Sequence, residues 1–154
     1  MCQHTTFVSI NRFERKKDVG KAVRAFALLA PQLEAAEFTS LRLILAGGYD
    51  PRVAENVEYK QELEDLASGL GVKDQVVFKP SFSGEERSAM LEKGLCIVYT
   101  PANEHFGIVP VEGMYAGCPV VACNSGGPME SIGENPFFRC LGDPRIRLLA
   151  FVRV

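Results

Sequence analysis

Hydrophobic positions along the chain alternate between two periods. Short continuous runs of apolar and β-branched residues predict strands, and segments with helical spacing lie between them. The five runs are TTFVSIN (5–11), LRLILA (41–46), QVVFKP (75–80), LCIVYTP (95–101) and CPVVACN (118–124). Strands that alternate with helices favour a parallel sheet with right-handed crossovers, covered on both faces. The pattern therefore predicts an α/β, Rossmann-like domain.

Helical spacing is clearest in four segments. Apolar positions from 19 to 33 predict one helix, and those from 59 to 70 predict a second. Ser83-Gly84-Glu85-Glu86 is a capping box that starts a third helix, which we expect to end near Lys93. A fourth helix is expected around 108–116. Beyond Ile132 the periodic pattern fails, so we expect one domain over residues 5–132 and a divergent tail over 133–154.

Composition narrows the class of protein. A chain of 154 residues with 47% hydrophobic and 23% charged residues is typical of one globular domain. Its net charge of −2 gives no general basic field for nucleic acid. No apolar run reaches the roughly 18–20 residues of a membrane span, and the N-terminus does not resemble a signal peptide. Five cysteines without a CxxC motif, with two histidines, favour a reduced, cytosolic-facing chain without a zinc site.

Polar residues and glycines gather where the predicted strands end. The segments 11–17, 47–48, 103–107 and 124–127 follow the first, second, fourth and fifth strands. Taken singly, each has an ordinary explanation as a solvated basic face or a turn. Because ligands of open α/β sheets bind beyond the carboxyl ends of the strands, their convergence on one edge favours a binding site.

The residue types at this edge suit an anion. Arg12 and Lys17 supply fixed positive charge, and the helix expected near Ile108 offers free backbone N–H groups. Glu112, in the first turns of that helix, can accept hydrogen bonds from two vicinal hydroxyls such as those of a ribose. The chain has neither G-x-G-x-x-G nor a P-loop motif. For His105 we favour a local structural role.

Four stretches together resemble a known family. EHFGIVPVE, with Glu104 and Glu112 in an E-x7-E spacing, resembles the signature of retaining GT-B glycosyltransferases of family four. INRFERKKDVGKAVRAFALL, LRLILAGGYD and CPVVACNSGGPMESI are similar to that family's first strand and helix, its second strand with a glycine turn, and the strand after the second glutamate. The match runs in order over about residues 5–132. It implies the C-terminal, donor-binding half of a GT-B fold.

The resemblance also implies roles for individual residues. The implied catalytic residues are Arg12, Lys17 and Glu104, with the two cations on the donor diphosphate and the acid near the transferred sugar. The implied donor-binding residues are Arg12, Lys17, Gly47, Gly48, Glu104, Phe106, Gly107, Ile108 and Glu112. The two glutamates then hold the sugar and the ribose of one donor and are not an acid–base pair of the glycosidase kind. No cofactor or metal is expected.

A finer resemblance concerns the donor and the acceptor. SINRFERKK, LAGGYDPRVAENVEY, YTPANEHFGIVPVE and NSGGPMESI resemble the members that transfer mannose from GDP-mannose to a dolichyl-diphosphate-linked oligosaccharide for protein N-glycosylation. Those members act at the cytosolic face of the endoplasmic reticulum. Compared with them, the chain is expected to lack the N-terminal acceptor domain and to be truncated at its C-terminus. We therefore expect a nucleotide sugar as its direct ligand, a lipid-linked acceptor only through the missing domain, and no transfer by the isolated chain.

Three alternatives remain open. The first alternative is a non-catalytic nucleotide-sugar-binding fragment. The second is a family-four glycosyltransferase domain that uses a UDP-sugar. The third alternative is a Rossmann dehydrogenase or another nucleotide-binding protein, which predicts NAD binding and needs a glycine fingerprint after the first strand. NRFERK contains none.

Overall fold

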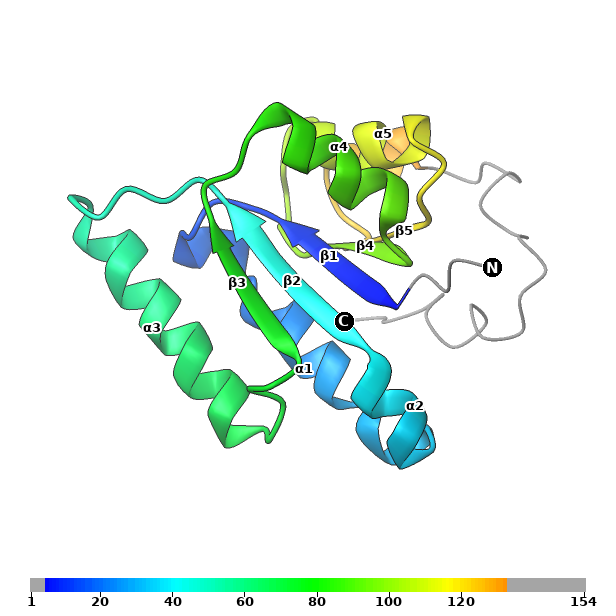
Figure 1. The fold of residues 1–154 in the computed structure, drawn as a ribbon. Helices are drawn as coiled ribbons and strands as arrows, with labels where there is room; N and C mark the ends of the chain where they lie inside the picture. Colours follow the sequence, from blue (N-terminus) through cyan, green and yellow to red (C-terminus); the bar gives the residue numbers. More distant parts are fainter. Residues whose placement is uncertain (1–4, 133–154) are drawn as a thin grey trace.

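A five-stranded parallel sheet forms the centre of the molecule (Figure 1). The computed structural model describes residues 5–132. The strands are β1 (Thr6–Ile10), β2 (Arg42–Gly47), β3 (Val76–Pro80), β4 (Cys96–Tyr99) and β5 (Val120–Ala122), and they lie in the order β3-β2-β1-β4-β5. The chain therefore builds outward from β1 to β3, and then crosses over β1 to add β4 on the other side. This change of direction between β1 and β4 is the topological switch point of the sheet.

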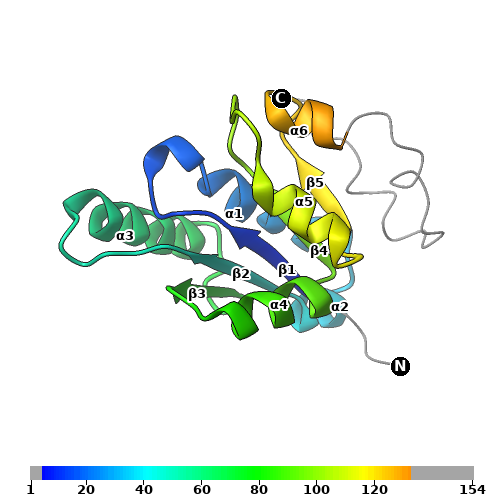
Figure 2. The same cartoon turned by 90° about the horizontal axis from the view of Figure 1, so that it is seen from above.

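Helices cover both faces of the sheet (Figures 1 and 2). The helices are α1 (Gly20–Ala27), α2 (Ala35–Ser40), α3 (Ala54–Gly69), α4 (Gly84–Lys93), α5 (Ile108–Tyr115) and α6 (Gly127–Ser131), with short 3-10 turns η1 (Arg15–Lys17) and η2 (Ala30–Gln32). Buried side chains of α1, α2 and α3 pack with Phe7 and Leu43 on one face. Those of α4 and α5 pack with Val8 and Ile97 on the other. The expected α/β class and the cover on both faces are confirmed.

The strand sequences explain the two cores. Successive residues of a strand point to opposite faces, so a strand between two helical layers must be apolar on both sides. In β1, Phe7 packs edge-on against Phe26 of α1, with ring centroids 5.9 Å apart. Its neighbour Val8 is fully buried among residues of α4 and α5. The continuous apolar runs in the sequence are therefore a consequence of the double cover.

Most boundaries follow the sequence, but one expected helix is wrong. The apolar pattern over 19–33 predicted a single helix, whereas α1 ends at Ala27 and η2 and α2 follow. Pro31 lies in the first turn of η2, where its missing N–H and its ring prevent the preceding helix from continuing. Phe38 then buries the face of α2 against α1, with its ring centroid 5.4 Å from that of Phe26.

Other elements differ at their ends. The second helix begins at Ala54 and not near 59, and the segment 124–127 leads directly into α6. The capping box is confirmed: the backbone N–H of Glu86 donates to Ser83 Oγ (3.2 Å), and the backbone N–H of Ser83 donates to Glu86 Oε2 (2.8 Å). Within 5–132, no helix combines the length and the apolar character needed to cross a bilayer. The expectation of a divergent tail over 133–154 lies outside the described residues.

Candidate functional site

Lys17 and Glu104 meet at the switch point between β1 and β4. Lys17 ends η1, which follows β1, and Glu104 lies in the loop that follows β4. Lys17 Nζ donates to Glu104 Oε1 at 2.5 Å, with side chains that are 16% and 30% exposed. Thr100 Oγ1, directly after β4, donates to the backbone carbonyl of Lys17 at 2.7 Å and ties the two loops together. A cation and a carboxylate from distant parts of the sequence are thus fixed side by side.

Arg12 lies in the same loop as Lys17 and faces solvent. Its side chain is 72% exposed, and Nη1 lies 3.7 Å from Glu14 Oε1. The following residue, Phe13, donates its backbone N–H to the carbonyl of Gly48 at 3.2 Å, so the loops after β1 and β2 run together. An exposed guanidinium at this position is free to turn toward a ligand at the carboxyl edge.

The two glycines after β2 have different structural reasons. A Cβ added to Gly47 would lie 1.6 Å from the carbonyl oxygen of Asn11, so this glycine is required by the neighbouring backbone of the protein itself. A Cβ added to Gly48 would meet only Arg12 Cγ, at 3.6 Å. Gly48 therefore lies beside the side chain of Arg12 with room around it. Its small size keeps this part of the edge open.

The N-terminal half of α3 holds the cation-bearing loop, which the sequence did not indicate. Asn56 is buried, and its Nδ2 donates to the carbonyl of Phe13 (3.1 Å) while its Oδ1 accepts from the backbone N–H of Asp50 (3.0 Å). Arg15 donates through Nη2 to Glu58 (3.0 Å) and Glu62 (2.6 Å) on the same helix. The available signal was that Asn56 precedes the apolar positions 59 and 63 at helical spacing and so shares their buried face.

Loops after β4 and β5 interlock beside Glu104. The backbone N–H of Gly127 donates to the carbonyl of Glu104 at 2.6 Å. A Cβ on Gly127 would come within 2.3 Å of the carbonyl oxygen of Phe106, so only glycine permits this contact. The backbone N–H of Asn103 donates to Ser125 Oγ at 3.1 Å. The backbone that carries Glu104 is therefore held by α6 and the turn before it.

The segment 106–108 forms the start of α5. Gly107 is the N-cap, with a φ of 74°, and no side chain caps this end of the helix. Its left-handed conformation favours glycine, and the helix start lies over the ring of Tyr99. Burial, with a further contribution from the nearby charge of Glu104, raises the pKa of Tyr99 to about 12, so this hydroxyl stays neutral. His105, in the same loop, is exposed.

Glu112 lies one turn into α5 and pairs with a residue that the sequence did not indicate. Arg87 of α4 donates through Nη2 to Glu112 Oε2. Both side chains are partly buried, at 28% and 35% exposure. Nothing in the local sequence joins these positions, because they lie 25 residues apart on two helices that pack on the same face of the sheet.

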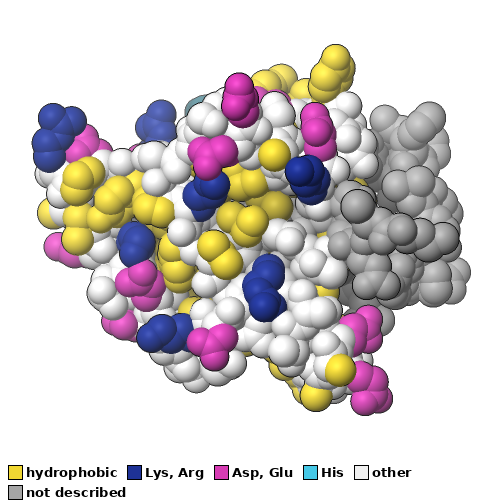
Figure 3. Space-filling view, viewed as in Figure 1, with side chains coloured by type: hydrophobic (Ala, Val, Ile, Leu, Met, Phe, Trp, Pro, Cys, Tyr) yellow, Lys and Arg dark blue, Asp and Glu magenta, His cyan; other side chains and the backbone are white. Residues whose placement is uncertain are grey.

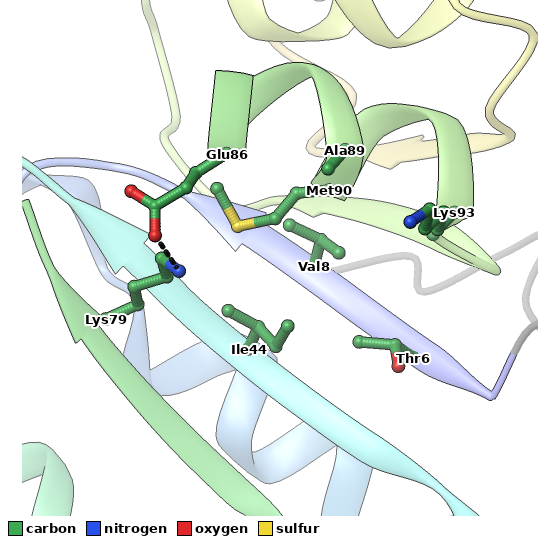
Figure 4. Close-up of a pocket in the computed structure, with 9 residues that line it drawn as sticks. Thr6, Val8, Ile44, Lys79, Glu86, Ala89, Met90 and Lys93 are labelled. Carbon is green, nitrogen blue, oxygen red and sulfur yellow. Dashed lines mark ion pairs between the residues drawn. The ribbon is translucent and has the colours of Figure 1, made fainter. Parts of the chain in front are cut away.

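A hollow on the α4 side of the sheet lies away from these residues (Figure 4). It has a volume of about 290 Å³ and is lined by residues such as Val8, Ile44 and Met90. Lys79 and Glu86 close one end of it with an ion pair of 2.6 Å. In space-filling view, apolar side chains gather over the middle of this face, with charged side chains around them (Figure 3). None of the site residues expected from the sequence lines the hollow.

Comparison with known sequences gives consistent matches. Residues 3–138 match the family described as "Glycosyl transferases group 1". The chain is 46% identical over 139 residues to the alpha-1,3/1,6-mannosyltransferase ALG2 of Mus musculus, covering 90% of this chain and 34% of that protein. The ALG2 protein of Homo sapiens is 47% identical over 138 residues, covering 89% and 33% respectively. The chain thus spans about a third of the length of the curated relatives it matches.

Solved structures agree on the fold. Sucrose-phosphate synthase from Thermosynechococcus elongatus superposes with a TM-score of 0.72 at 25% identity, over 84% of this chain and 30% of that one. The C-terminal domain of the glycosyl transferase group 1 protein LpcC from Francisella tularensis gives 0.65 at 20% identity, over 79% and 60%. The expected Rossmann-like domain of a GT-B glycosyltransferase and the expected resemblance to alpha-1,3/1,6-mannosyltransferases are therefore confirmed. This chain belongs to the glycosyltransferase group 1 family.

Proposed function

We propose that the chain carries the donor site of a mannosyltransferase that transfers mannose from GDP-mannose to a dolichyl-diphosphate-linked oligosaccharide. The identity of 46–47% to alpha-1,3/1,6-mannosyltransferases supports this activity. The observation that carries the site is the Lys17–Glu104 pair at the switch point, where open α/β sheets bind their ligands.

In this proposal the donor extends along the carboxyl edge of the sheet. The diphosphate lies between Arg12, Lys17 and the free N–H groups at the start of α5, while Glu104 contacts the mannose and Glu112 the ribose. Lys17 leaves Glu104 for the phosphate when the donor binds, because a diphosphate carries more negative charge than one carboxylate. The two acids then bind different ends of the same molecule.

The reaction breaks the bond between the anomeric carbon and the β-phosphate oxygen, and it forms a bond from that carbon to the oxygen of an acceptor hydroxyl, whose proton passes to the departing phosphate. Electrons of the broken bond remain on the departing GDP. Arg12 and Lys17 stabilise this charge as it develops. Removing one such electrostatic contact typically costs about 3–4 kcal/mol of transition-state stabilisation.

The acceptor and the place of action belong to the same proposal. Because the chain matches only about a third of its relatives, we propose that acceptor binding depends on the other parts of such a protein. Transfer then requires both parts, and it takes place at the cytosolic face of the endoplasmic reticulum. We expect the isolated chain to bind the donor without transferring mannose.

A second candidate has a UDP-sugar as donor. The HepE protein of Anabaena, solved in complex with UDP, superposes with a TM-score of 0.67 at 28% identity over 82% of this chain and 31% of that one. That observation keeps uridine nucleotides as an alternative for the same edge.

Titration calorimetry on the purified 154-residue chain tests these proposals. GDP and GDP-mannose are expected to bind more tightly than UDP, and Lys17→Met to weaken GDP binding by about tenfold or more. Tighter binding of UDP would favour the second candidate. A folded chain that binds neither nucleotide would overturn the donor site, and mannose transfer by this chain alone would contradict the expected need for other parts.

A further inference from the structure

We infer that Arg87 is a positioning residue, which aims the Glu112 carboxylate at the ribose of the bound nucleotide. The inference rests on the proposed donor site and adds a residue on α4 to it. It is based on the ion pair between Arg87 Nη2 and Glu112 Oε2, which joins α4 to α5. Neither side chain is fully exposed, so water screens the pair only in part.

α4 is well suited to hold a guanidinium in place. Its first turn is fixed by the capping box of Ser83 and Glu86, and Met90 and Leu91 are buried against the sheet. Glu86 also turns toward Lys79 of β3, as Figure 4 shows, in a second and more exposed ion pair. Arg87, the next residue, therefore leaves a helix whose position is set by other contacts.

The guanidinium has one unusual feature. Its Nε is buried and finds no hydrogen-bond partner among residues 5–132. A buried donor of a charged group without a partner is unfavourable. Packing alone therefore does not explain why an arginine stands at position 87. Holding the charged carboxylate of Glu112 gives a reason that the local packing does not supply.

One oxygen of the Glu112 carboxylate accepts a hydrogen bond from Arg87, and the other can accept one from a ligand. Oε2 accepts from Arg87, whereas within the described part of the chain no donor reaches Oε1. A carboxylate held by one oxygen keeps a fixed direction for the other, which can accept from a ribose hydroxyl. Without Arg87, Glu112 samples other rotamers and the hydroxyl contact is lost. Arg87 should therefore control the preference for ribose over 2′-deoxyribose, and leave the diphosphate contacts as they are.

Calorimetry with GDP and 2′-deoxy-GDP tests this role. The wild-type chain is expected to prefer GDP by about tenfold, and Glu112→Gln to lose most of that preference. Arg87→Met should reduce the preference to about twofold or less while its affinity for 2′-deoxy-GDP stays within about twofold of wild type. Arg87→Lys, which keeps the charge, should recover part of the preference. Lys79→Met is the matched control, because it removes the other ion pair of α4 and should keep the wild-type preference.

Each other outcome has a defined meaning. An unchanged preference in Arg87→Met overturns the inference, and so does an equal loss of affinity for both nucleotides, which is the signature of a purely structural arginine. A loss of preference in Lys79→Met as large as in Arg87→Met also overturns it. If Arg87→Met does not fold, judged by circular dichroism, Arg87→Lys decides. A preference for GDP clearly below that of wild type supports the inference, and the full wild-type preference overturns it. Absence of GDP binding by wild type would instead remove the proposed function itself.

Discussion

The ammonium of Lys17 lies 2.5 Å from the carboxylate of Glu104, although 87 positions of sequence separate the two residues. The pair exists because β1 and β4 are neighbours in the sheet and their carboxyl ends share one edge. Thr100 and Gly127 hold the two loops from either side by bonding the backbone of Lys17 and of Glu104. Each charge is therefore the partner that keeps the other in place.

Replacing Glu104 by glutamine should separate its effect on the nucleotide from its effect on the sugar. The variant removes a negative charge beside Lys17, so GDP should bind about two- to fivefold more tightly, because the diphosphate no longer competes with an anion. The preference for GDP-mannose over GDP should fall. Calorimetry with both ligands measures the two effects, with Glu92→Gln on the exposed side of α4 as the control. Weaker GDP binding by Glu104→Gln would contradict the arrangement.

Replacing the two neighbouring glycines by alanine should change the free energy of unfolding by very different amounts. Gly47→Ala places a methyl group 1.6 Å from the carbonyl oxygen of Asn11, and we expect a loss of about 3 kcal/mol or more in the free energy of unfolding. Gly48→Ala meets only Arg12 Cγ at 3.6 Å, so its unfolding free energy should change by less than about 1 kcal/mol. Urea unfolding compares the two variants directly. Similar stabilities would show that the close approach of Asn11 is not a constraint.

Asn56 should support both stability and binding. Asn56→Leu keeps the size of the side chain but leaves the carbonyl of Phe13 and the backbone N–H of Asp50 without their partner. We expect a loss of about 2 kcal/mol or more in unfolding free energy, together with weaker GDP binding because the loop of Arg12 and Lys17 loosens. Gln61→Leu is the control, since it removes an exposed bond on the same helix worth about 0.5 kcal/mol or less. Wild-type GDP affinity in Asn56→Leu would show that α3 does not position the loop.

Alkaline pH should destabilise the fold through buried thiols. Burial raises the pKa of Cys96 from its ordinary 9.0 to about 12, and that of Cys118 to about 11. The unfolded chain releases these protons first, so stability is complete below pH 9 and falls as the pH rises toward 12. Each thiol contributes at most about 1.4 kcal/mol per pH unit in that window.

Urea midpoints measured between pH 8 and about 10.5, with a reductant present, test this expectation. Cys96→Ala should flatten the decline even if its stability at neutral pH is lower, because only the slope reports the titration. Ser9→Ala is a matched truncation in the neighbouring β1 that removes no titrating group, and it should keep the wild-type slope. An unchanged slope in Cys96→Ala would refute the role of the thiol.

The sequence reveals those parts of the fold and the site that depend on neighbours along the chain. All five strands, the capping box and the gathering of polar residues at strand ends follow from local pattern and from the rule that parallel strands share a carboxyl edge. That rule places Lys17 and Glu104 at the same edge of the sheet, whereas the pairing of β1 with β4 that brings them into contact comes from the structure. The assigned roles of the site residues in binding a donor stay predictions.

The residues that the sequence did not indicate act across helices. Arg87 and Asn56 each lie on a helix between strands, and each reaches a segment far away in sequence. Their partners depend on how α4 packs beside α5, and α3 beside the loop after β1, which apolar periodicity does not specify. The wrong helix over 19–33 is different in kind, because Pro31 marks in the sequence itself a break that the apolar spacing does not show.

The central position of β1 has a consequence for the growing chain. β1 can pair with β2, and β2 with β3, while α1 and α3 cover them, once the chain up to residue 80 has left the ribosome. The other edge of β1 stays unpaired until β4 has been synthesised, and until then Lys17 lacks Glu104 as its partner. This carboxyl edge is therefore completed only after β4 has been synthesised, and under the proposed function capture of GDP by nascent chains would report that the second half of the sheet has closed.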